Sequence, residues 1–237
     1  MFDFTDQVVI VTGANGELGK ATAEAFAAAG AKLGLLGRNL ERLQEAFPTY
    51  QNSAQTLFLV ADLTQEAATH AAIDRAVEHF GRIDVLVNTA GGYRAGQPVH
   101  EMSADLWNFM FDINARSVLH ASQAVIPQML RQQRGKIISF GAKSALSSGA
   151  KNVAHGASKA AVLRLTESMS AELKTEGINV NCIIPGTLDT PANRRGMPNA
   201  DTSRWVQPEA LAEVILFLAS DAARTIHGAV IPAFGLG

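Results

Sequence analysis

Cysteine is almost absent from this chain of 237 residues, in which Cys182 is the only one. A single thiol excludes an internal disulfide and leaves no cysteine cluster for zinc. Because Cys182 lies in the apolar run 180–184, we expect a buried, inert side chain and not a nucleophile. The histidines show no His-x-x-x-His spacing, so the sequence predicts no metal site.

Long apolar runs and an excess of charge of one sign are also lacking. No run approaches the roughly 20 apolar residues that cross a bilayer, and the N-terminus has no basic segment followed by a long apolar stretch. The formal net charge is −2, without the basic stripe that nucleic acid requires. We therefore expect a cytoplasmic protein that binds neither membranes nor nucleic acid.

Apolar side chains are plentiful by contrast, at 47% of the chain, which is enough to bury one substantial core. Short apolar runs alternate with helical patterns, and this alternation predicts an α/β domain with a doubly wound parallel sheet flanked by helices. Strands are expected at 8–11, 32–36, 56–60, 83–88, 136–140, 179–184 and 229–233. Helices are expected at 18–29, 65–79, 103–131, 157–174 and 208–219.

Several residues predict where these helices begin and end. Gly30 is expected to close the first helix, and Ser103 to cap the long third one. Pro127 is expected to kink or end that long helix. The segment 190–204 is the least regular part, and it follows a strand end, where ligands bind in doubly wound sheets.

Three glycines join the first expected strand to the first expected helix, in the segment Thr12-Gly-Ala-Asn-Gly-Glu-Leu-Gly19. Gly13 would permit a tight turn, Gly16 would let the backbone approach a pyrophosphate, and Gly19 would let the helix pack closely on the strand. The phosphates would then meet the N-terminal amides of the helix. This spacing predicts a Rossmann-like dinucleotide site, although a glycine triplet is also compatible with a plain tight turn.

The end of the second expected strand indicates which dinucleotide binds. NAD-selective sites usually place a carboxylate there for the ribose 2′-hydroxyl, whereas this chain has Gly37 followed by Arg38. Arginine can pair with a 2′-phosphate, so we predict NADP(H) in preference to NAD(H). The alternative is that Arg38 is a solvated charge at the start of the next helix.

Further motifs follow in a fixed order: Ala61-Asp-Leu63, Asn88-Thr-Ala-Gly91, Asn114 and Pro185-Gly-Thr-Leu-Asp-Thr190. With the glycine segment, they resemble the short-chain dehydrogenase/reductase family over essentially the whole chain. The resemblance implies one NAD(P)-binding domain over 1–237. The expected cofactor contacts are Gly13, Asn15, Gly16, Glu17, Leu18, Gly19, Arg38, Asp62, Leu63, Asn88, Ala90, Gly91, Lys159, Pro185, Gly186, Thr187, Leu188 and Thr190.

Two longer segments resemble one branch of that family, the dihydropteridine reductases. Gly141-Ala-Lys-Ser-Ala-Leu146 is similar to a loop of those enzymes, and 188–205 is similar to their substrate-side loop. Trp205 and Met197 in this loop could form an apolar lid or could equally be core beneath it. The expected substrate contacts are Tyr93, Ala142, His155 and Trp205.

The catalytic residues depart from the family pattern, which generally uses Asn, Ser, Tyr and Lys. Asn114 and Lys159 match, but Ala142 stands where the serine is expected and His155 where the tyrosine is expected. The resemblance implies that the tyrosine gives a proton to the developing alkoxide, so its loss is the serious change. Ser144 would replace the serine only if the loop shifted, and we expect it to be a loop or capping residue.

His155 therefore has two interpretations. An imidazole with a pKa near 6.5 is a competent acid near neutrality, which favours a catalytic role. Against this, its ring reaches less far than a phenol, and the cation of Lys159 one helical turn later would disfavour imidazolium. His155 could instead merely fill the space that the tyrosine leaves. The catalytic set is predicted as Asn114, His155 and Lys159.

These observations predict an NADP(H)-dependent oxidoreductase that transfers hydride to a small carbonyl or to a quinonoid or pteridine-like acceptor. An electron-poor acceptor is favoured, because it takes hydride with little help from an acid. The alternative is an NADP(H)-binding sensor or structural partner with impaired catalysis. The family resemblance also implies a homodimer or homotetramer formed through the long helices.

Overall fold

The computed structural model describes residues 2–51 and 53–236, which form one seven-stranded parallel sheet. Its strand order is β3-β2-β1-β4-β5-β6-β7, so the chain reverses its direction of winding between β1 and β4. The expected single-domain, Rossmann-like, doubly wound fold is confirmed. The strands are β1 (Val8–Thr12), β2 (Lys32–Gly37), β3 (Thr56–Val60), β4 (Val85–Asn88), β5 (Gly135–Phe140), β6 (Ile178–Pro185) and β7 (Val230–Ala233).

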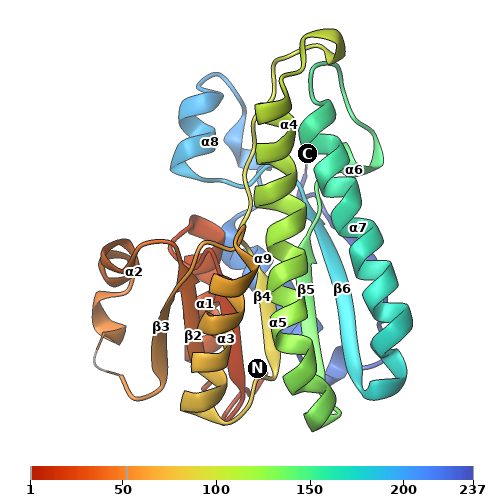
Figure 1. The fold of residues 1–237 in the computed structure, drawn as a ribbon. Helices are drawn as coiled ribbons and strands as arrows, with labels where there is room; N and C mark the ends of the chain where they lie inside the picture. Colours follow the sequence, from red (N-terminus) through yellow and green to blue (C-terminus); the bar gives the residue numbers. More distant parts are fainter. Residues whose placement is uncertain (1, 52, 237) are drawn as a thin grey trace.

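Helices cover both faces of this sheet (Figure 1). On one face α3, α5 and α7 bury Ile73, Val125 and Met169 against the strands, and on the other α1 and α9 bury Phe26 and Ile215. Apolar side chains on both faces explain why the strands are continuous apolar runs. The helices are α1 (Glu17–Ala28), α2 (Leu40–Ala46), α3 (Glu66–Phe80), α4 (Ala104–Phe111), α5 (Ser117–Gln132), α6 (Lys143–Leu146), α7 (Val153–Leu173), α8 (Pro191–Gly196) and α9 (Pro208–Ala219).

The expected long helix at 103–131 is wrong as a single helix. Ser103 does cap it, because its Oγ accepts a hydrogen bond from the Leu106 amide at 3.2 Å. A π-helical turn at Asp112–Arg116 then separates α4 from α5. Such turns insert an extra residue and rotate the side chains that follow, often at functional sites. Here the turn carries Asn114, which is fully buried.

Pro127 does not end α5, which continues for five more residues to Gln132. A proline removes the amide that would bond the carbonyl four residues earlier. That residue, Gln123, is exposed, as is Pro127 itself, so water can satisfy the freed carbonyl. The proline is therefore tolerated inside α5 because it lies on the exposed face of the helix.

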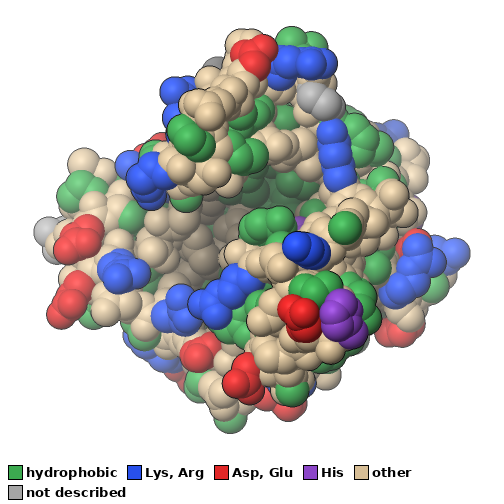
Figure 2. Space-filling model, turned by 90° about the horizontal axis from the view of Figure 1, so that it is seen from above, with side chains coloured by type: hydrophobic (Ala, Val, Ile, Leu, Met, Phe, Trp, Pro, Cys, Tyr) green, Lys and Arg blue, Asp and Glu red, His purple; other side chains and the backbone are tan. Residues whose placement is uncertain are grey.

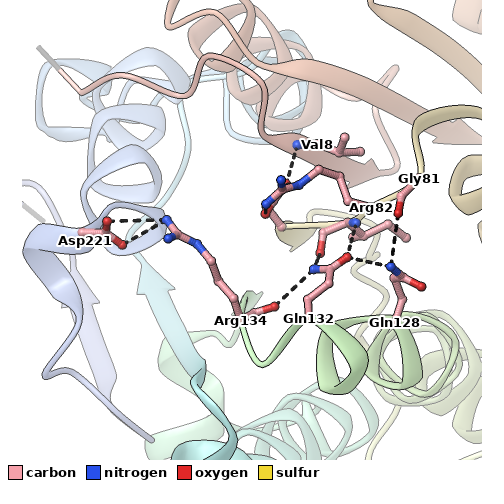
Figure 3. Close-up of polar contacts among 9 residues, drawn as sticks. Val8, Gly81, Arg82, Gln128, Gln132, Arg134 and Asp221 are labelled. Atoms are coloured by element: carbon pink, nitrogen blue, oxygen red, sulfur yellow. Dashed lines mark hydrogen bonds and ion pairs between the residues drawn. The ribbon is translucent and has the colours of Figure 1, made fainter.

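The amino end of the sheet is closed by a polar network that is distant from the strand ends where ligands bind in such folds. The Asp84 carboxylate accepts from the Val8 amide at 2.9 Å and pairs with Arg82. Gln132 both accepts from and donates to the Ile83 backbone, at 3.0 and 2.7 Å (Figure 3). These bonds fix the start of β4 against α5.

Candidate active site

The turn between β1 and α1 forms a cradle built from backbone. Gly13 has φ +61°, and a Cβ there would lie 2.8 Å from Ala90 Cα. A Cβ on Gly19 would lie 2.8 Å from Ala14 Cα and would also collide with the Gly13 carbonyl. The expected roles of Gly13 in a tight turn and of Gly19 in close packing therefore match these contacts. Gly16 precedes α1 and leaves the first amides of that helix accessible to a ligand.

A cavity of about 300 Å³ lies beside this cradle at the carboxyl ends of the strands. Figure 2 looks onto this end and shows a deep hollow there. Eight of the expected cofactor contacts line the cavity: Gly13, Asn15, Gly16, Arg38, Asp62, Leu63, Ala90 and Gly91. Five other residues line the cavity that were not among the expected cofactor contacts, although Gly37, Ala61 and Thr89 belong to the motifs described above: Leu36, Gly37, Ala61, Thr89 and Ile113.

The remaining expected cofactor contacts do not line this cavity. Glu17, Leu18 and Gly19 form the first turn of α1. Asn88 is buried at the end of β4 and donates to Ser139 Oγ at 3.1 Å. Five others lie at the end of β6 or just after it, in one segment: Pro185, Gly186, Thr187, Leu188 and Thr190. The Gly186 amide donates to the Ala233 carbonyl, and Leu188 forms a β-bridge with Val206. Thr190 caps α8.

Arg38 is the cation at the edge of the cavity. Its side chain is exposed, and no carboxylate of the described residues pairs with it. The neighbouring Asn39 caps α2 by accepting from the Arg42 amide at 2.9 Å. The start of α2 is therefore stabilised without Arg38, whose guanidinium is available to an anionic ligand.

Asn114 is held at the centre of the catalytic set. Its Oδ1 accepts from the Gly92 amide at 2.9 Å, and its Nδ2 donates to the Gly92 carbonyl at 3.1 Å. The same Nδ2 donates to Ser158 Oγ at 3.0 Å. These bonds fix the amide orientation and tie the π-helical turn to the loop after β4 and to α7.

His155 lies in the first turn of α7, which begins at Val153, four residues before the expected helix start. Its Nδ1 lies 3.0 Å from Ser144 Oγ, and its ring meets the Tyr93 ring edge-on at 4.8 Å between centroids. Burial, with a smaller contribution from the Lys159 charge, lowers the pKa of the imidazole from 6.5 to about 4. The ring is therefore neutral near pH 7, as the proximity of Lys159 in sequence suggested.

Ser144 was expected to be a loop or capping residue, and its contact with His155 was not predicted. It belongs to α6, a helix of one turn that no periodic pattern predicted. This helix brings the Ser144 hydroxyl to His155, 3.0 Å from Nδ1. A hydroxyl that donates to Nδ1 would leave the proton on Nε2, whereas one that accepts would leave it on Nδ1. Ser144 is thus placed to select the tautomer of His155.

Lys159 lies one turn further along α7, with its side chain buried. Its Nζ donates to the Phe140 carbonyl at 2.8 Å. Burial lowers the pKa of this ammonium from 10.5 to about 8, so it remains mostly protonated at neutral pH. A Cβ on Gly91 would lie 3.4 Å from this Nζ and 3.1 Å from Asn114 Oδ1, so the cavity and the catalytic set are adjacent.

The expected substrate contacts divide into two groups. Tyr93 is 67% exposed and covers His155, and Ala142 precedes α6 without any hydrogen-bonding side chain. Trp205 instead lines a separate depression of about 280 Å³ with Lys143 and Thr187. Met197 is 41% exposed and does not line that depression, so the two proposed lid residues are not brought together.

The sequence matches the profile of the short chain dehydrogenase family over residues 7–200. The chain belongs to this family. A relative in Staphylococcus saprophyticus, named as an uncharacterized oxidoreductase, is 32% identical over 219 residues, which are 92% of each chain. The family membership and this relative identify the protein as an oxidoreductase.

Two solved structures of similar fold carry a nucleotide. Xylitol dehydrogenase bound to NAD+ has a TM-score of 0.90 at 28% identity, covering 98% of this chain and 99% of its own. ElxO with NADP bound has a TM-score of 0.88 at 25% identity, covering 97% of both chains. The short-chain dehydrogenase fold of these neighbours therefore occurs with either nucleotide.

Two absences apply to residues 2–51 and 53–236. No helix there combines the length and the apolar character needed to cross a membrane. The same residues contain no group of three or more His, Cys, Asp or Glu side chains that could hold a metal ion.

Proposed function

We propose that the protein is an NADP(H)-dependent reductase of an electron-poor acceptor, such as a quinonoid dihydropterin or a quinone. The observation that carries the proposal is the adjacency of two features: a cavity with an unpaired arginine, and a catalytic set whose acid position holds a neutral histidine. The first feature supports the choice of nucleotide and the second supports the choice of acceptor.

The cavity fits a dinucleotide. Gly13 and Gly19 let the turn pack closely, because a side chain on either would collide with backbone. The amides at the start of α1 would then bind a pyrophosphate. Asp62 and Leu63 line the cavity where the family resemblance puts the adenine, and the Pro185–Thr190 segment would hold the nicotinamide end. When bound, the nicotinamide supplies the hydride.

Arg38 favours NADP(H) over NAD(H). A 2′-phosphate carries charge that pairs well with a guanidinium, whereas a 2′-hydroxyl is best bound by a carboxylate. The strand ends in Gly37, which has no side chain to offer, and Arg38 beside it has no acidic partner among the described residues. Solved relatives carry either nucleotide, so the preference depends on this local contact.

The neutral imidazole favours an acceptor that needs little acid. Reduction of a ketone develops an alkoxide, and general acid catalysis typically contributes about 10²–10⁴-fold to such a step. His155, with a pKa of about 4, holds its remaining proton too firmly to be a strong acid, although it can donate a hydrogen bond. An acceptor that regains aromaticity on reduction takes hydride with less assistance. Small carbonyl compounds are therefore the slower substrates.

Tyr93 and Ala142 would form the acceptor side of the site. The exposed phenol ring of Tyr93 offers a flat apolar surface next to His155, and Ala142 leaves space where the family resemblance places a serine. Asn114 would keep its position through the Gly92 and Ser158 bonds while an acceptor binds. A planar ring system suits such a surface better than a flexible chain.

A homodimer or homotetramer is part of the proposal. An apolar groove of about 550 Å³ runs between α5 and α7, next to the π-helical turn. Its lining includes Leu119, which is 36% exposed, and Leu165. A second copy packing its own α5 and α7 there would bury this surface, as the family resemblance implies.

The test is NADPH oxidation by the purified protein with a quinonoid dihydropterin, a quinone and a simple ketone, with His155→Ala measured in parallel. We expect the first two acceptors to turn over faster than the ketone, and most of that activity to survive in His155→Ala. Faster ketone turnover would overturn the choice of acceptor. Nucleotide binding without turnover of any acceptor would instead assign the chain to the sensors or structural partners.

A further inference from the structure

A second polar cavity, of about 320 Å³, lies at the amino end of the sheet, opposite the nucleotide cavity. It is formed where α5 leads into β5, where α7 leads into β6, and where the segment after α9 returns to β7. Four cations and a single carboxylate line it, although the whole chain is slightly acidic. These charged side chains are Arg134, Lys136, Lys174, Arg224 and Asp221.

Lys136 is the unusual member of this lining, because its side chain is only 6% exposed. Its Nζ donates to Asn179 Oδ1 at 2.7 Å, and no carboxylate of the described residues pairs with it within 4.0 Å. Burial lowers the pKa of this ammonium. The nearby charge of Asp221 partly opposes this shift, but no carboxylate in the described part of the chain contacts Lys136. A buried charge is costly unless it is paired, so Lys136 lacks a counter-ion in direct contact.

Asn179 does not supply a counter-ion, because hydrogen bonds hold its amide in one orientation. Lys136 and Asn179 are register partners on β5 and β6, so their side chains leave the sheet on the same face. The Asn179 Nδ2 donates to the Arg224 and Ile226 carbonyls at 3.0 and 2.9 Å. Its oxygen therefore faces Lys136 as a neutral acceptor that carries no charge.

The only acidic side chain of the lining is already engaged. Asp221 pairs with Arg134 at 3.3 Å, and Figure 3 shows the Arg134 guanidinium directed at that carboxylate. The positive charges of Lys136, Lys174 and Arg224 are left without an acid of their own in the cavity. Cations at the ends of helices are common because they stabilise the dipole, which accounts for Lys174 after α7. It does not account for Lys136, which lies in a strand.

We propose that this cavity binds a phosphate group, from inorganic phosphate or from a small phosphomonoester. A phosphate oxyanion accepts several charge-assisted hydrogen bonds at once, from ammonium and guanidinium donors that converge on it. It would also supply the counter-ion that Lys136 lacks. The site uses none of the residues assigned to the nucleotide or to the acceptor, so it is independent of the proposed reductase activity.

The test is isothermal titration of the full chain with inorganic phosphate and, separately, with glycerol phosphate, against chloride at equal ionic strength. The variants are the double exchange Lys174→Ala with Arg224→Ala, which removes two exposed cations, and Arg38→Ala as the matched control at the nucleotide cavity. We expect binding in the wild type and in Arg38→Ala, and binding weaker by about tenfold or more in the double variant. Lys136→Met should also abolish binding while leaving the fold intact, since it removes the buried charge.

Three results would overturn the proposal: no phosphate binding beyond that of chloride, unchanged binding in the double variant, or loss of binding in Arg38→Ala alone. The last result would mean that phosphate had entered the nucleotide cavity. Failure of NADPH to bind would leave this titration unaffected, which separates the two proposals. Tighter binding of glycerol phosphate supports a phosphomonoester as the ligand, and tighter binding of inorganic phosphate supports the free ion.

Discussion

The cradle at 12–19 and the histidine pocket lie side by side, yet they are built in opposite ways. The cradle is a continuous segment whose shape is set by the backbone and by glycines that have no side chain. The pocket assembles Tyr93, Asn114, Ser144 and His155 from separate segments, and its geometry depends on contacts between their side chains. A backbone site can be inferred from spacing, whereas a side-chain site depends on which distant groups touch.

The largest effect should come from filling the cradle. In Gly19→Ala the new methyl group would collide with the backbone of Gly13 and Ala14. Because backbone cannot move aside as a flexible side chain can, we take the cost at the upper end of the overpacking range, about 3 kcal/mol. Alanine is favoured over glycine in helices by about 1 kcal/mol, so the net loss of unfolding free energy should be about 2 kcal/mol. NADPH affinity should fall as well. Urea unfolding and a fluorescence titration measure the two effects.

Gly196→Ala is the matched control, because Gly196 also lies in a helix and a Cβ there would meet nothing within 4 Å. It should leave stability unchanged or raise it slightly. Equal stability of Gly19→Ala and the wild type would mean that the cradle tolerates a side chain. The cradle would then not depend on the close approach of backbone, which is what distinguishes it from the pocket.

A tyrosine at position 155 should turn the pocket into a ketone-reducing site. His155→Tyr replaces a neutral ring whose pKa is about 4 by a phenol beside the Lys159 cation. We expect the kcat for a simple ketone with NADPH to rise by about 10²-fold, the lower end of general acid catalysis. His155→Phe has the same ring without the hydroxyl and should show no such gain. A similar gain in both variants would attribute the effect to shape.

The pH dependence of stability should distinguish the pocket from the cradle. The His155 pKa is about 4 in the folded chain and 6.5 when the ring is free, so between these values the unfolded chain binds a proton that the folded chain does not. Stability contributed by the neutral ring is therefore complete above pH 6.5 and is lost as the pH falls towards 4. In full this shift corresponds to about 3 kcal/mol, and with partial screening by solvent we expect a loss on the order of 2 kcal/mol.

Urea unfolding at several pH values measures this loss as the difference between the wild type and His155→Gln, which cannot titrate. The difference should grow between pH 4 and 6.5 and stay constant outside that range. Parallel curves for the two proteins would show that His155 is not held neutral.

The smallest effect should follow the loss of one charge at the edge of the cradle. Arg38→Ala should lower the preference for NADPH over NADH by about tenfold, equivalent to about 1.4 kcal/mol, because a charge-assisted contact with the 2′-phosphate is lost. Arg42→Ala removes a cation of α2 that does not line the cavity and should leave the preference unchanged. Dissociation constants of NADPH and NADH, measured for the wild type and both variants, give this preference.

The sheet was predictable because its strands are buried on both faces. Their continuous apolar runs placed β1, β3 and β6 within two residues of their observed ends. Short helices were not predictable, because one turn carries no periodic pattern, and so α6 and α8 were missed. The π-helical turn was missed because the contacts of Asn114 with Gly92 and Ser158 join segments distant in sequence, which no local pattern encodes.

The two regions of the site differ in the same way. The spacing of Gly13, Gly16 and Gly19 was enough to predict the cradle, because its geometry is local. For His155 the sequence indicated a neutral ring through its spacing from Lys159, but burial contributes more to its lowered pKa. Its contact with Ser144 depends on the placement of α6, and only the folded chain reveals it.

The single thiol can report how often the central sheet opens. Cys182 lies in the middle of β6 between Ser139 and Val230, with no exposed surface, and burial raises its pKa to about 11. A thiol-specific reagent can therefore modify the chain only when β6 separates from its neighbours. The rate of labelling in native buffer then reports how often the centre of the sheet opens, undisturbed by fraying at its edges.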